Sequence, residues 1–540
     1  MLPISDVNAL GRTSSAASEL LNYYMYRRAM VELPKSRTPY FFLAVQRGCL
    51  EAARLFIKLG VDVNMRVLVR DSEDELCLDD WALRSFAVND GEVSSEHNPG
   101  HTAILMAIRD RHDCEPMVRL LIDAGADITS PCIEFRSPLH KAVQIGAMPI
   151  IELLLDRGAD PQIIGRYGQT LLHIAAKNLS AAPVRILLSF GLDMRVSDDC
   201  GFTALHNAAI SGGVETVEAL LNWGANVSPN DQGAGAHPLV DDVGPDNTAL
   251  QVDRHAPDIK MVTPPPYQGV DVNSVVDHFG SPLQAAASRR NLSIVHLLLD
   301  HGADVNGMGG YCGNALQAAA SVDSYEIVRV LVEHGADVNA TGGHFGNALQ
   351  AAASVGSYEI VRVLVEHGAD VNATGGHFGN ALQAASTCSP EVVRLLLKCG
   401  ADINAPGGYF GNALQAAVSR FRDSEEDEDV VCLLLNAGAD IHASGGLYGN
   451  TLCAAAEEGN TVAVGLLIDR GADMDALGAN GLNALCIAAR DDEADIVQML
   501  LDNGADINST GGKYGSALLT ALHFDNYEVA SILKASGARA

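Results

Sequence analysis

A three-residue motif, Gly-Ala-Asp or a close variant, recurs fourteen times and constrains the fold of this chain more than any other feature. Nine of the thirteen gaps between the motif glycines are 33 residues, and one more is 32. A fixed period of about 20 to 50 residues is typical of stacked copies of one supersecondary element. Residues 318–350 and 351–383 differ only at Asp323 and Gly356. The sequence therefore predicts an array of repeats rather than several unrelated domains.

Each repeat has the pattern of a short helix pair. In one of the near-identical copies, Asn347 can accept a backbone N–H as the N-cap of a small-residue helix over 348–354. Ser357 then begins a second helix, 358–367, which has too many apolar positions for a single stripe and is expected to be buried between neighbours. Gly368 supplies the left-handed turn that ends it. A Gly-rich segment leads to the next cap, so each repeat should carry a projecting loop.

These repeats resemble the ankyrin-repeat family. The family's Thr-Pro-Leu-His element is matched at 137–140, 170–173 and 203–206, and its C-terminal counterpart here is Asn-Ala-Leu-Gln. The Gly-Gly-x-aromatic-Gly style of the preceding loops resembles ankyrin arrays of filamentous fungi. The resemblance implies an all-α ankyrin-repeat solenoid of about 14 helix-pair units with projecting loops, interrupted by one degenerate unit. The Asn-Ala-Leu-Gln elements start at Asn314, Asn347, Asn380 and Asn412.

The irregular gaps divide the predicted array. The gap from Gly60 to Gly125 holds 32 extra residues, which we interpret as a decayed unit, a long loop or a partner-binding appendage. Three consecutive prolines, 264–266, would break a helix in the segment before Gly269. The predicted parts are an N-terminal helical segment (1–36), a block of five units with an insertion at 63–99 (37–228), a degenerate Pro-rich unit or linker (229–268), and a block of eight units (269–540).

An acidic run lengthens one of the C-terminal repeats. The gap from Gly400 to Gly438 is 38 residues, and the extra residues lie around 424–429, Ser-Glu-Glu-Asp-Glu-Asp. We expect a solvated loop between the two helices of that repeat, or a segment that attracts a basic partner.

The first 36 residues lie outside the repeat pattern. Residues 6–13 and 20–28 resemble the back half of an F-box, the segment that helps to dock the Skp adaptor of cullin-type ubiquitin ligases. The front half of that motif is missing here, apart from a trace at Leu2-Pro3. The alternative interpretation is an amphipathic helix that covers the first repeat.

Composition excludes several classes of partner. The chain has 36 Lys and Arg against 67 Asp and Glu, a formal net charge of −31, which opposes binding to nucleic acid and to anionic membranes. No run of 18 apolar residues could span a bilayer, and residues 1–18 lack the pattern of a secretory signal. The eleven cysteines are scattered, without a CxxC pair. We expect a reduced, cytoplasmic or nuclear monomer.

No motif of catalysis or cofactor binding is present. The chain lacks GxxxxGK[ST], HExxH and GxSxG, so we predict no enzyme activity, no cofactor and no metal site. His140, His173 and His206 recur at one position of the repeat, and the family resemblance implies that they hydrogen-bond along the stack. His344 and His377 are expected to be roughly 10 Å apart if repeats stack at helix-packing distance, which is too far for shared metal ligation.

Aromatic residues of the loops and polar residues of the first helices are the candidate partner contacts. The aromatic residues either pack between loops or form a ladder along one face, suited to hot-spot contacts. The first-helix positions should face a groove. The candidate residues are Tyr311, His344, Phe345, His377, Phe378, Tyr409, Phe410, Tyr448 and Tyr514 on loops, with Lys141, Gln144, Lys177, Asn178 and Asn207 on or beside first helices.

We therefore expect a non-catalytic protein–protein interaction scaffold that binds a partner protein, a basic one given the charge, through its concave surface. One alternative is an F-box-type substrate receptor of a cullin ubiquitin ligase, with a Skp-type adaptor as partner. The other is a nuclear transcriptional co-regulator that acts through protein contacts and not through direct nucleic-acid binding.

Overall fold

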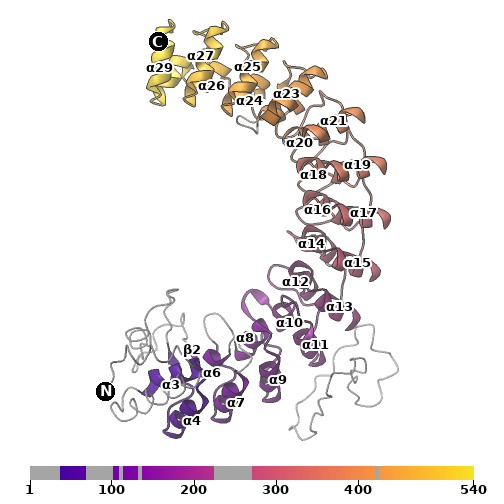
Figure 1. Cartoon of the computed structure of the whole chain (residues 1–540), viewed down its shortest axis with the longest axis vertical. Coiled ribbons are helices and arrows are strands. Elements are labelled where there is room, and N and C mark those ends of the chain that lie inside the picture. Colours follow the sequence, from indigo (N-terminus) through magenta and orange to yellow (C-terminus); the bar gives the residue numbers. More distant parts are fainter. Residues whose placement is uncertain are drawn as a thin grey trace. The chain divides into compact units, whose positions relative to one another are not determined.

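The computed structural model describes residues 37–67, 101–108, 114–131, 137–223, 270–419 and 425–539. Its contacts divide the chain into two compact units, Met1–Asp271 and Val272–Ala540, which we call the N-terminal unit and the C-terminal unit. Both consist of successive pairs of short helices (Figure 1). No helix in these described ranges is long and apolar enough to cross a membrane.

The N-terminal unit contains five described helix pairs and one short 3-10 turn, η1 (Arg166–Gly168). The pairs are α3 (Arg37–Gln46) with α4 (Leu50–Lys58), α6 (Ala103–Ala107) with α7 (Glu115–Asp123), α8 (Pro138–Ile145) with α9 (Met148–Asp156), α10 (Leu171–Ala175) with α11 (Ala182–Ser189), and α12 (Ala204–Ser211) with α13 (Val214–Trp223).

The C-terminal unit contains eight described helix pairs and two small antiparallel strand pairs, β3 (Ser444–Gly445) with β4 (Gly449–Asn450) and β5 (Thr510–Gly511) with β6 (Gly515–Ser516). The helix pairs are α14 (Pro282–Ser288) with α15 (Leu292–Asp300), α16 (Ala315–Ser321) with α17 (Tyr325–Glu333), α18 (Ala348–Ser354) with α19 (Tyr358–Glu366), α20 (Ala381–Ser386) with α21 (Pro390–Lys398), α22 (Ala413–Val418) with α23 (Glu425–Asn436), α24 (Thr451–Glu457) with α25 (Thr461–Asp469), α26 (Ala484–Arg490) with α27 (Ala494–Asp502), and α28 (Ala517–His523) with α29 (Tyr527–Ala535).

Like helices stack on like helices. First helix α16 packs between α14 and α18, and second helix α17 packs between α15 and α19. Within the C-terminal unit, the first helices α14 to α20 lie on the inner side of the curve and the second helices α15 to α21 on the outer side (Figure 1). Each repeat buries its apolar surface against its neighbours, as an all-α solenoid must.

The residues of one repeat show why this packing works. The alanines of α18 leave no side chain that would hold α16 and α20 apart, and Ala351 is fully buried. Ile360 and Leu364 of α19 are also fully buried. The Asn347 side chain accepts the Gln350 amide at 2.8 Å, which confirms the predicted cap. Gly368 has φ of +87°, the left-handed turn predicted at the end of the second helix.

A column of asparagines ties the turns of the C-terminal unit together. The Asn339 side chain donates to the Gly368 carbonyl at 2.9 Å and accepts the Asp370 amide at 2.7 Å, so that one amide group bridges two repeats. The same pair of bonds recurs along the column. Its members are Asn273, Asn306, Asn339, Asn372 and Asn404.

The repeats on either side of the predicted insertion at 63–99 stack directly on each other. Asn64 donates to the Gly125 carbonyl at 3.0 Å and accepts the Asp127 amide at 2.7 Å, the same bridge as in the C-terminal column. Strand β1 (Arg66–Val67) pairs antiparallel with β2 (His101–Thr102). The insertion therefore begins and ends within the loop between these two repeats. Residues 68–100 lie outside the described residues.

The expectation of a loop at the acidic run is wrong. Helix α23 begins at Glu425, so the acidic residues form its first turns instead of a linker. Acidic residues are favoured at a helix N-terminus by the helix dipole, which explains why a charge run can extend a helix here. The predictions for 1–36 and for 229–268, including the three prolines, fall outside the described residues.

Candidate partner-binding surface

The loops of the central C-terminal repeats close on themselves and lie against one another. The Gly342 amide donates to the Gly346 carbonyl at 2.8 Å. Gly343 has φ of +64°, and a Cβ at this residue would collide with the backbone carbonyl of Cys312 in the preceding loop. Glycine is needed here because the two backbones approach so closely.

One backbone hydrogen bond joins each of these loops to the next. The amides of His344, His377 and Tyr409 donate to the carbonyls of the residues at the same position one repeat earlier, at 2.8, 2.9 and 2.9 Å. The Tyr311 amide donates to the His278 carbonyl in the same way, at 2.8 Å. Successive loops are therefore spaced like neighbouring β-strands, about 4.8 Å apart.

This spacing stacks four aromatic rings into a column that we call the outer ladder, Tyr311, His344, His377 and Tyr409. Successive ring centroids are 4.7, 5.1 and 5.0 Å apart, with interplanar angles of 18°, 18° and 25°. His278 extends the column, tilted by 40° at 5.9 Å from Tyr311. His278 was not among the predicted contact residues, although it precedes Phe279-Gly280 just as His344 precedes Phe345-Gly346.

The predicted separation of His344 and His377, roughly 10 Å, is wrong: their ring centroids are 5.1 Å apart. Packed helices lie roughly 10 Å apart, whereas these loops are held at the closer spacing of strands joined by backbone hydrogen bonds. No cluster of three or more metal-ligating side chains occurs in the part of the chain that the structure describes.

A second column of rings lies behind the outer ladder. Phe378 and Phe410 are only 7% and 8% exposed and stack at a centroid distance of 6.4 Å. Phe345 is half-buried and meets His344 edge to face at 5.1 Å. The rings of Tyr311 and Tyr409, by contrast, are nearly half exposed. We assign the inner column to packing and keep the outer ladder as the candidate contact surface.

The outer ladder presents polar groups without partners of their own. Among the described residues, the structure shows no hydrogen bond from the phenols of Tyr311 and Tyr409 or from the imidazoles of His344 and His377. Burial and the neighbouring His377 lower the pKa of His344, so its neutral form is favoured. Because the ring faces stack on each other, a partner would meet ring edges and these polar groups.

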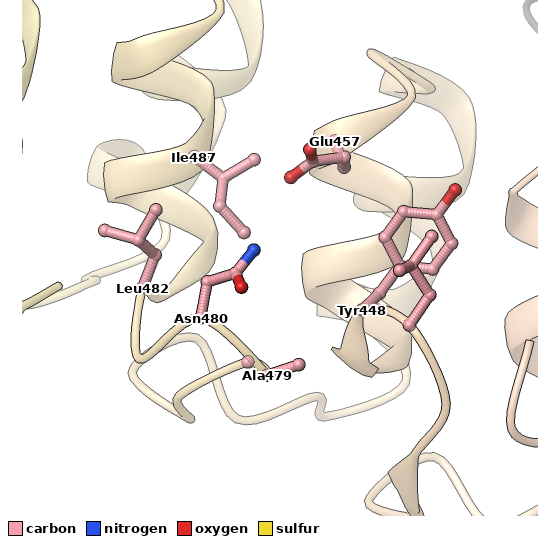
Figure 2. A pocket seen from close by; sticks show the side chains of 8 residues that line it. Tyr448, Glu457, Ala479, Asn480, Leu482 and Ile487 are labelled. Atoms are coloured by element: carbon pink, nitrogen blue, oxygen red, sulfur yellow. The ribbon is translucent and has the colours of Figure 1, made fainter.

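The ladder ends at a pocket. Leu447 takes the next outer position and donates its amide to the Tyr409 carbonyl at 3.1 Å. In the following loop the bond changes register, because Ala479 donates to the Tyr448 carbonyl at 3.1 Å. A pocket of about 110 Å³ opens there beside Tyr448 (Figure 2). Its lining residues are Leu447, Tyr448, Glu457, Gly478, Ala479, Asn480, Leu482 and Ile487.

Tyr514 belongs to a different cluster. Its ring stacks on His523 at 4.2 Å, meets Phe524 edge to face at 5.5 Å, and lies under the Lys513 ammonium at 5.5 Å. We therefore leave Tyr514 out of the outer ladder.

Most of the N-terminal candidates tie helices together. The Lys141 ammonium donates to the Leu105 carbonyl at 2.7 Å, and the Asn178 side chain donates to the Val143 carbonyl at 2.7 Å. Asn207 is buried and its side chain donates to the His173 carbonyl at 3.3 Å, so we remove Asn207 from the candidate contacts. Gln144 and Lys177 are exposed, and the Lys177 ammonium lies 3.4 Å from the Gln169 side-chain oxygen.

Comparison with protein families agrees with this geometry. A family model for ankyrin repeats (three copies) matches residues 77–165, 139–231, 258–342, 343–407, 414–511 and 452–540. The chain belongs to the ankyrin-repeat family. Ankyrin arrays are in general protein–protein interaction scaffolds, and this is the coarse function that the fold supports.

Among solved structures, the ankyrin chain is similar to the crystal structure of the human ASB11 ankyrin repeat domain. The two are 23% identical over 49% of this chain and 99% of that chain, with a TM-score of 0.37. No curated protein matches the sequence of this chain.

Proposed function

We propose that this ankyrin chain is a non-catalytic scaffold that holds a basic partner protein on the loop side of its C-terminal unit, with the outer ladder at the centre of the contact. The observation that carries the proposal is the ladder itself. Tyr311 and Tyr409 are nearly half exposed, His344 and His377 are partly buried, and no described residue hydrogen-bonds to the polar groups of these four rings.

Charge supports a basic partner. An exposed aspartate recurs in the turn of each of these repeats. In the bonds that the structure shows, its carboxylate accepts only neutral backbone amides. Asp337, for example, accepts the Asn339 amide at 2.9 Å. The whole chain has a formal net charge of −31. Complementary charge speeds encounter and selects partners. The column consists of Asp304, Asp337, Asp370, Asp402 and Asp440.

The order of the ladder also favours binding. Loops that are already fixed by cross-repeat hydrogen bonds lose little conformational freedom when a partner arrives. Tyrosine is enriched among the residues that dominate binding energy at protein interfaces. The proposed surface therefore combines rigidity, ring edges and hydrogen-bonding groups.

A matched pair of tyrosine variants tests the proposal. Tyr409 on the ladder is 45% exposed, and Tyr358 on second helix α19 is 40% exposed. Full-length chain carrying Tyr409→Ala should lose partner proteins that wild type captures from cell extract and that are identified by mass spectrometry. Tyr358→Ala should retain them. Equal loss with both variants, or no loss with Tyr409→Ala, would contradict the ladder as the contact surface.

The two alternative functions rest on other parts of the chain. The F-box-like segment lies within residues 1–36, outside the described residues, so adaptor docking stays a sequence-based hypothesis. A nuclear co-regulator would use the same ladder for protein contacts. Recovery of the Skp adaptor with full-length chain but not with a chain lacking 1–36 would favour the first, and nuclear exclusion of tagged protein would remove the second.

A further inference from the structure

The outer ladder presents ring edges and hydrogen-bond donors along one line. Because successive rings stack face to face, with interplanar angles of 18° to 25°, a partner meets mainly their edges. The edge of an aromatic ring carries partial positive charge. The phenols of Tyr311 and Tyr409 add O–H donors, and the neutral imidazoles between them each add one N–H. The ladder is therefore suited to an occupant that presents a line of hydrogen-bond acceptors.

The spacing of the rings selects among peptide conformations. Successive ring centroids of the ladder are 4.7, 5.1 and 5.0 Å apart. A polyproline II helix repeats every three residues with a rise of about 3.1 Å per residue, so like groups recur at about 9 Å, close to twice this spacing. Side chains on one face of a β-strand recur at about 6.7 Å, which matches neither one step of the ladder nor two. One turn of a polyproline II helix thus spans two steps of the ladder.

The hydrogen-bonding groups of a polyproline II helix also complement those of the ladder. Its backbone makes no internal hydrogen bonds, so every carbonyl is free to accept. Proline has no backbone N–H, so a proline-rich segment adds few donors that would need partners of their own. An α-helix has a pitch of about 5.4 Å, near one step of the ladder, but its carbonyls are already bonded except in the last turn. The free donors of the ladder therefore favour the polyproline II helix.

Charge indicates what should flank the prolines. The aspartates of the turns belong to the same loops as the rings, since Asp337 stands seven residues before His344 and Asp370 seven residues before His377. Asp277 is exposed and directly precedes His278. The loop segments 304–313, 337–346, 370–379 and 402–411 contain no lysine or arginine. Basic residues on either side of the prolines would complement this charge.

We propose that the outer ladder binds a proline-rich segment of the partner in the polyproline II conformation, flanked by basic residues. This inference rests on the function proposed above. The segment lies along the column, where its carbonyls accept hydrogen bonds from the hydroxyls of Tyr311 and Tyr409 and from the imidazoles between them. Its flanking cations meet the aspartates of the turns. The preformed helix loses little conformational freedom on binding.

A synthetic peptide tests the inference without knowledge of the partner. Fluorescently labelled Arg-Arg-(Pro)6-Arg-Arg is titrated into full-length chain, and its anisotropy is followed. Six prolines extend over about 19 Å, long enough to pass all four rings. Arg-Arg-(Gly)6-Arg-Arg has the same charge but is flexible, so the proline peptide should bind about tenfold more tightly. Equal binding of the two peptides, or no saturable binding of the proline peptide, would overturn the inference.

Two double variants locate the peptide on the chain. Tyr311→Phe with Tyr409→Phe keeps the stacked rings but removes both hydroxyls, and should weaken binding of the proline peptide about tenfold. The control is Tyr325→Phe with Tyr358→Phe, which removes two hydroxyls from second helices α17 and α19 and should leave binding unchanged. Unchanged binding in the ladder variant, or equal weakening in both variants, would overturn the inference.

Partner capture separates this inference from the general function. Excess proline peptide, but not glycine peptide, should displace the proteins that wild-type chain captures from extract. If Tyr409→Ala abolishes capture while the proline peptide neither binds nor displaces, the ladder stands as the contact surface and the polyproline II inference fails. If the proline peptide binds through the ladder hydroxyls while Tyr409→Ala retains all captured proteins, the peptide site stands and the proposed scaffold contact fails.

Discussion

The two units of this chain share one fold, but most of their repeats are joined by different cross-repeat bonds, the Asn64 bridge being common to both. In the N-terminal unit, side chains on or beside first helices reach the backbone of the preceding first helix, as Asn178 does to Val143. In the C-terminal unit the loops are tied to one another by backbone bonds, the asparagine column and stacked rings. The repeat thus determines the fold, while the type of cross-repeat bond determines whether first helices or loops are joined between neighbouring repeats.

One position shows the difference most clearly. His173 of α10 reaches the Phe202 carbonyl of the next loop through its imidazole, at 2.8 Å. Gln317 of α16, at the same position of its repeat, donates to the Ala340 carbonyl at 3.1 Å. Both side chains tie a helix to the following loop, but only the histidine can change its charge near neutral pH.

Disrupting the loop contacts of the C-terminal unit should have the largest effect. A Cβ at Gly376 would collide with the carbonyl of Phe345, and φ is +62°, so Gly376→Ala should raise the local free energy of the folded state by about 3 kcal/mol. Native-state hydrogen exchange of the neighbouring loops measures this change. Gly368→Ala is the control, because its Cβ meets nothing within 4 Å and only backbone strain of about 1 kcal/mol remains.

The sequence was enough for the fold because the period and the caps are local signals. Asn347 and Gly368 could be assigned their roles from residue type alone. The distance between His344 and His377 could not, because it depends on hydrogen bonds between loops and not on helix packing. The pocket was missed for the same reason: it follows from a change in loop register at Ala479, which has no simple signature in composition.

Removing one member of the asparagine column tests the second tie between repeats. Asn339→Ala deletes two cross-repeat hydrogen bonds and should destabilise the adjoining repeats by about 2 kcal/mol, measured by local hydrogen exchange. Thr129 at the equivalent N-terminal position bonds to Asp127 in its own turn, so Thr129→Ala should cost about 0.5 kcal/mol. If the two variants were destabilised equally, the Asn339 bonds between repeats would contribute no more stability than a hydrogen bond within one turn.

The side-chain bonds between first helices of the N-terminal unit can be tested in the same way, with a smaller expected effect. Asn178→Ala removes the bond to the Val143 carbonyl and should cost about 1 kcal/mol, seen as a lower urea midpoint of the transition reported by Trp223 in a Trp81→Phe background. Gln144→Ala, at an exposed first-helix position, should change the free energy of unfolding by less than about 0.5 kcal/mol. If Gln144→Ala destabilised the unit more than Asn178→Ala does, the Asn178 side chain would not be what joins these repeats.

The smallest expected effect is the pH dependence that His173 gives to the stability of the N-terminal unit. Burial lowers the pKa of His173, more than the Phe202 carbonyl and Asp198 raise it. The unfolded chain, with an ordinary histidine pKa of about 6.5, therefore takes up a proton that the folded chain resists. The stability contributed by His173 is complete above that pH and is lost as pH falls through it. His173→Gln introduces the glutamine that C-terminal repeats such as that of Gln317 have at this position. The variant should lose less stability than wild type between pH 7.5 and 5.5, measured as the free energy of unfolding from the Trp223 transition. The same slope in both proteins would show that His173 is protonated as easily in the fold as in the unfolded chain.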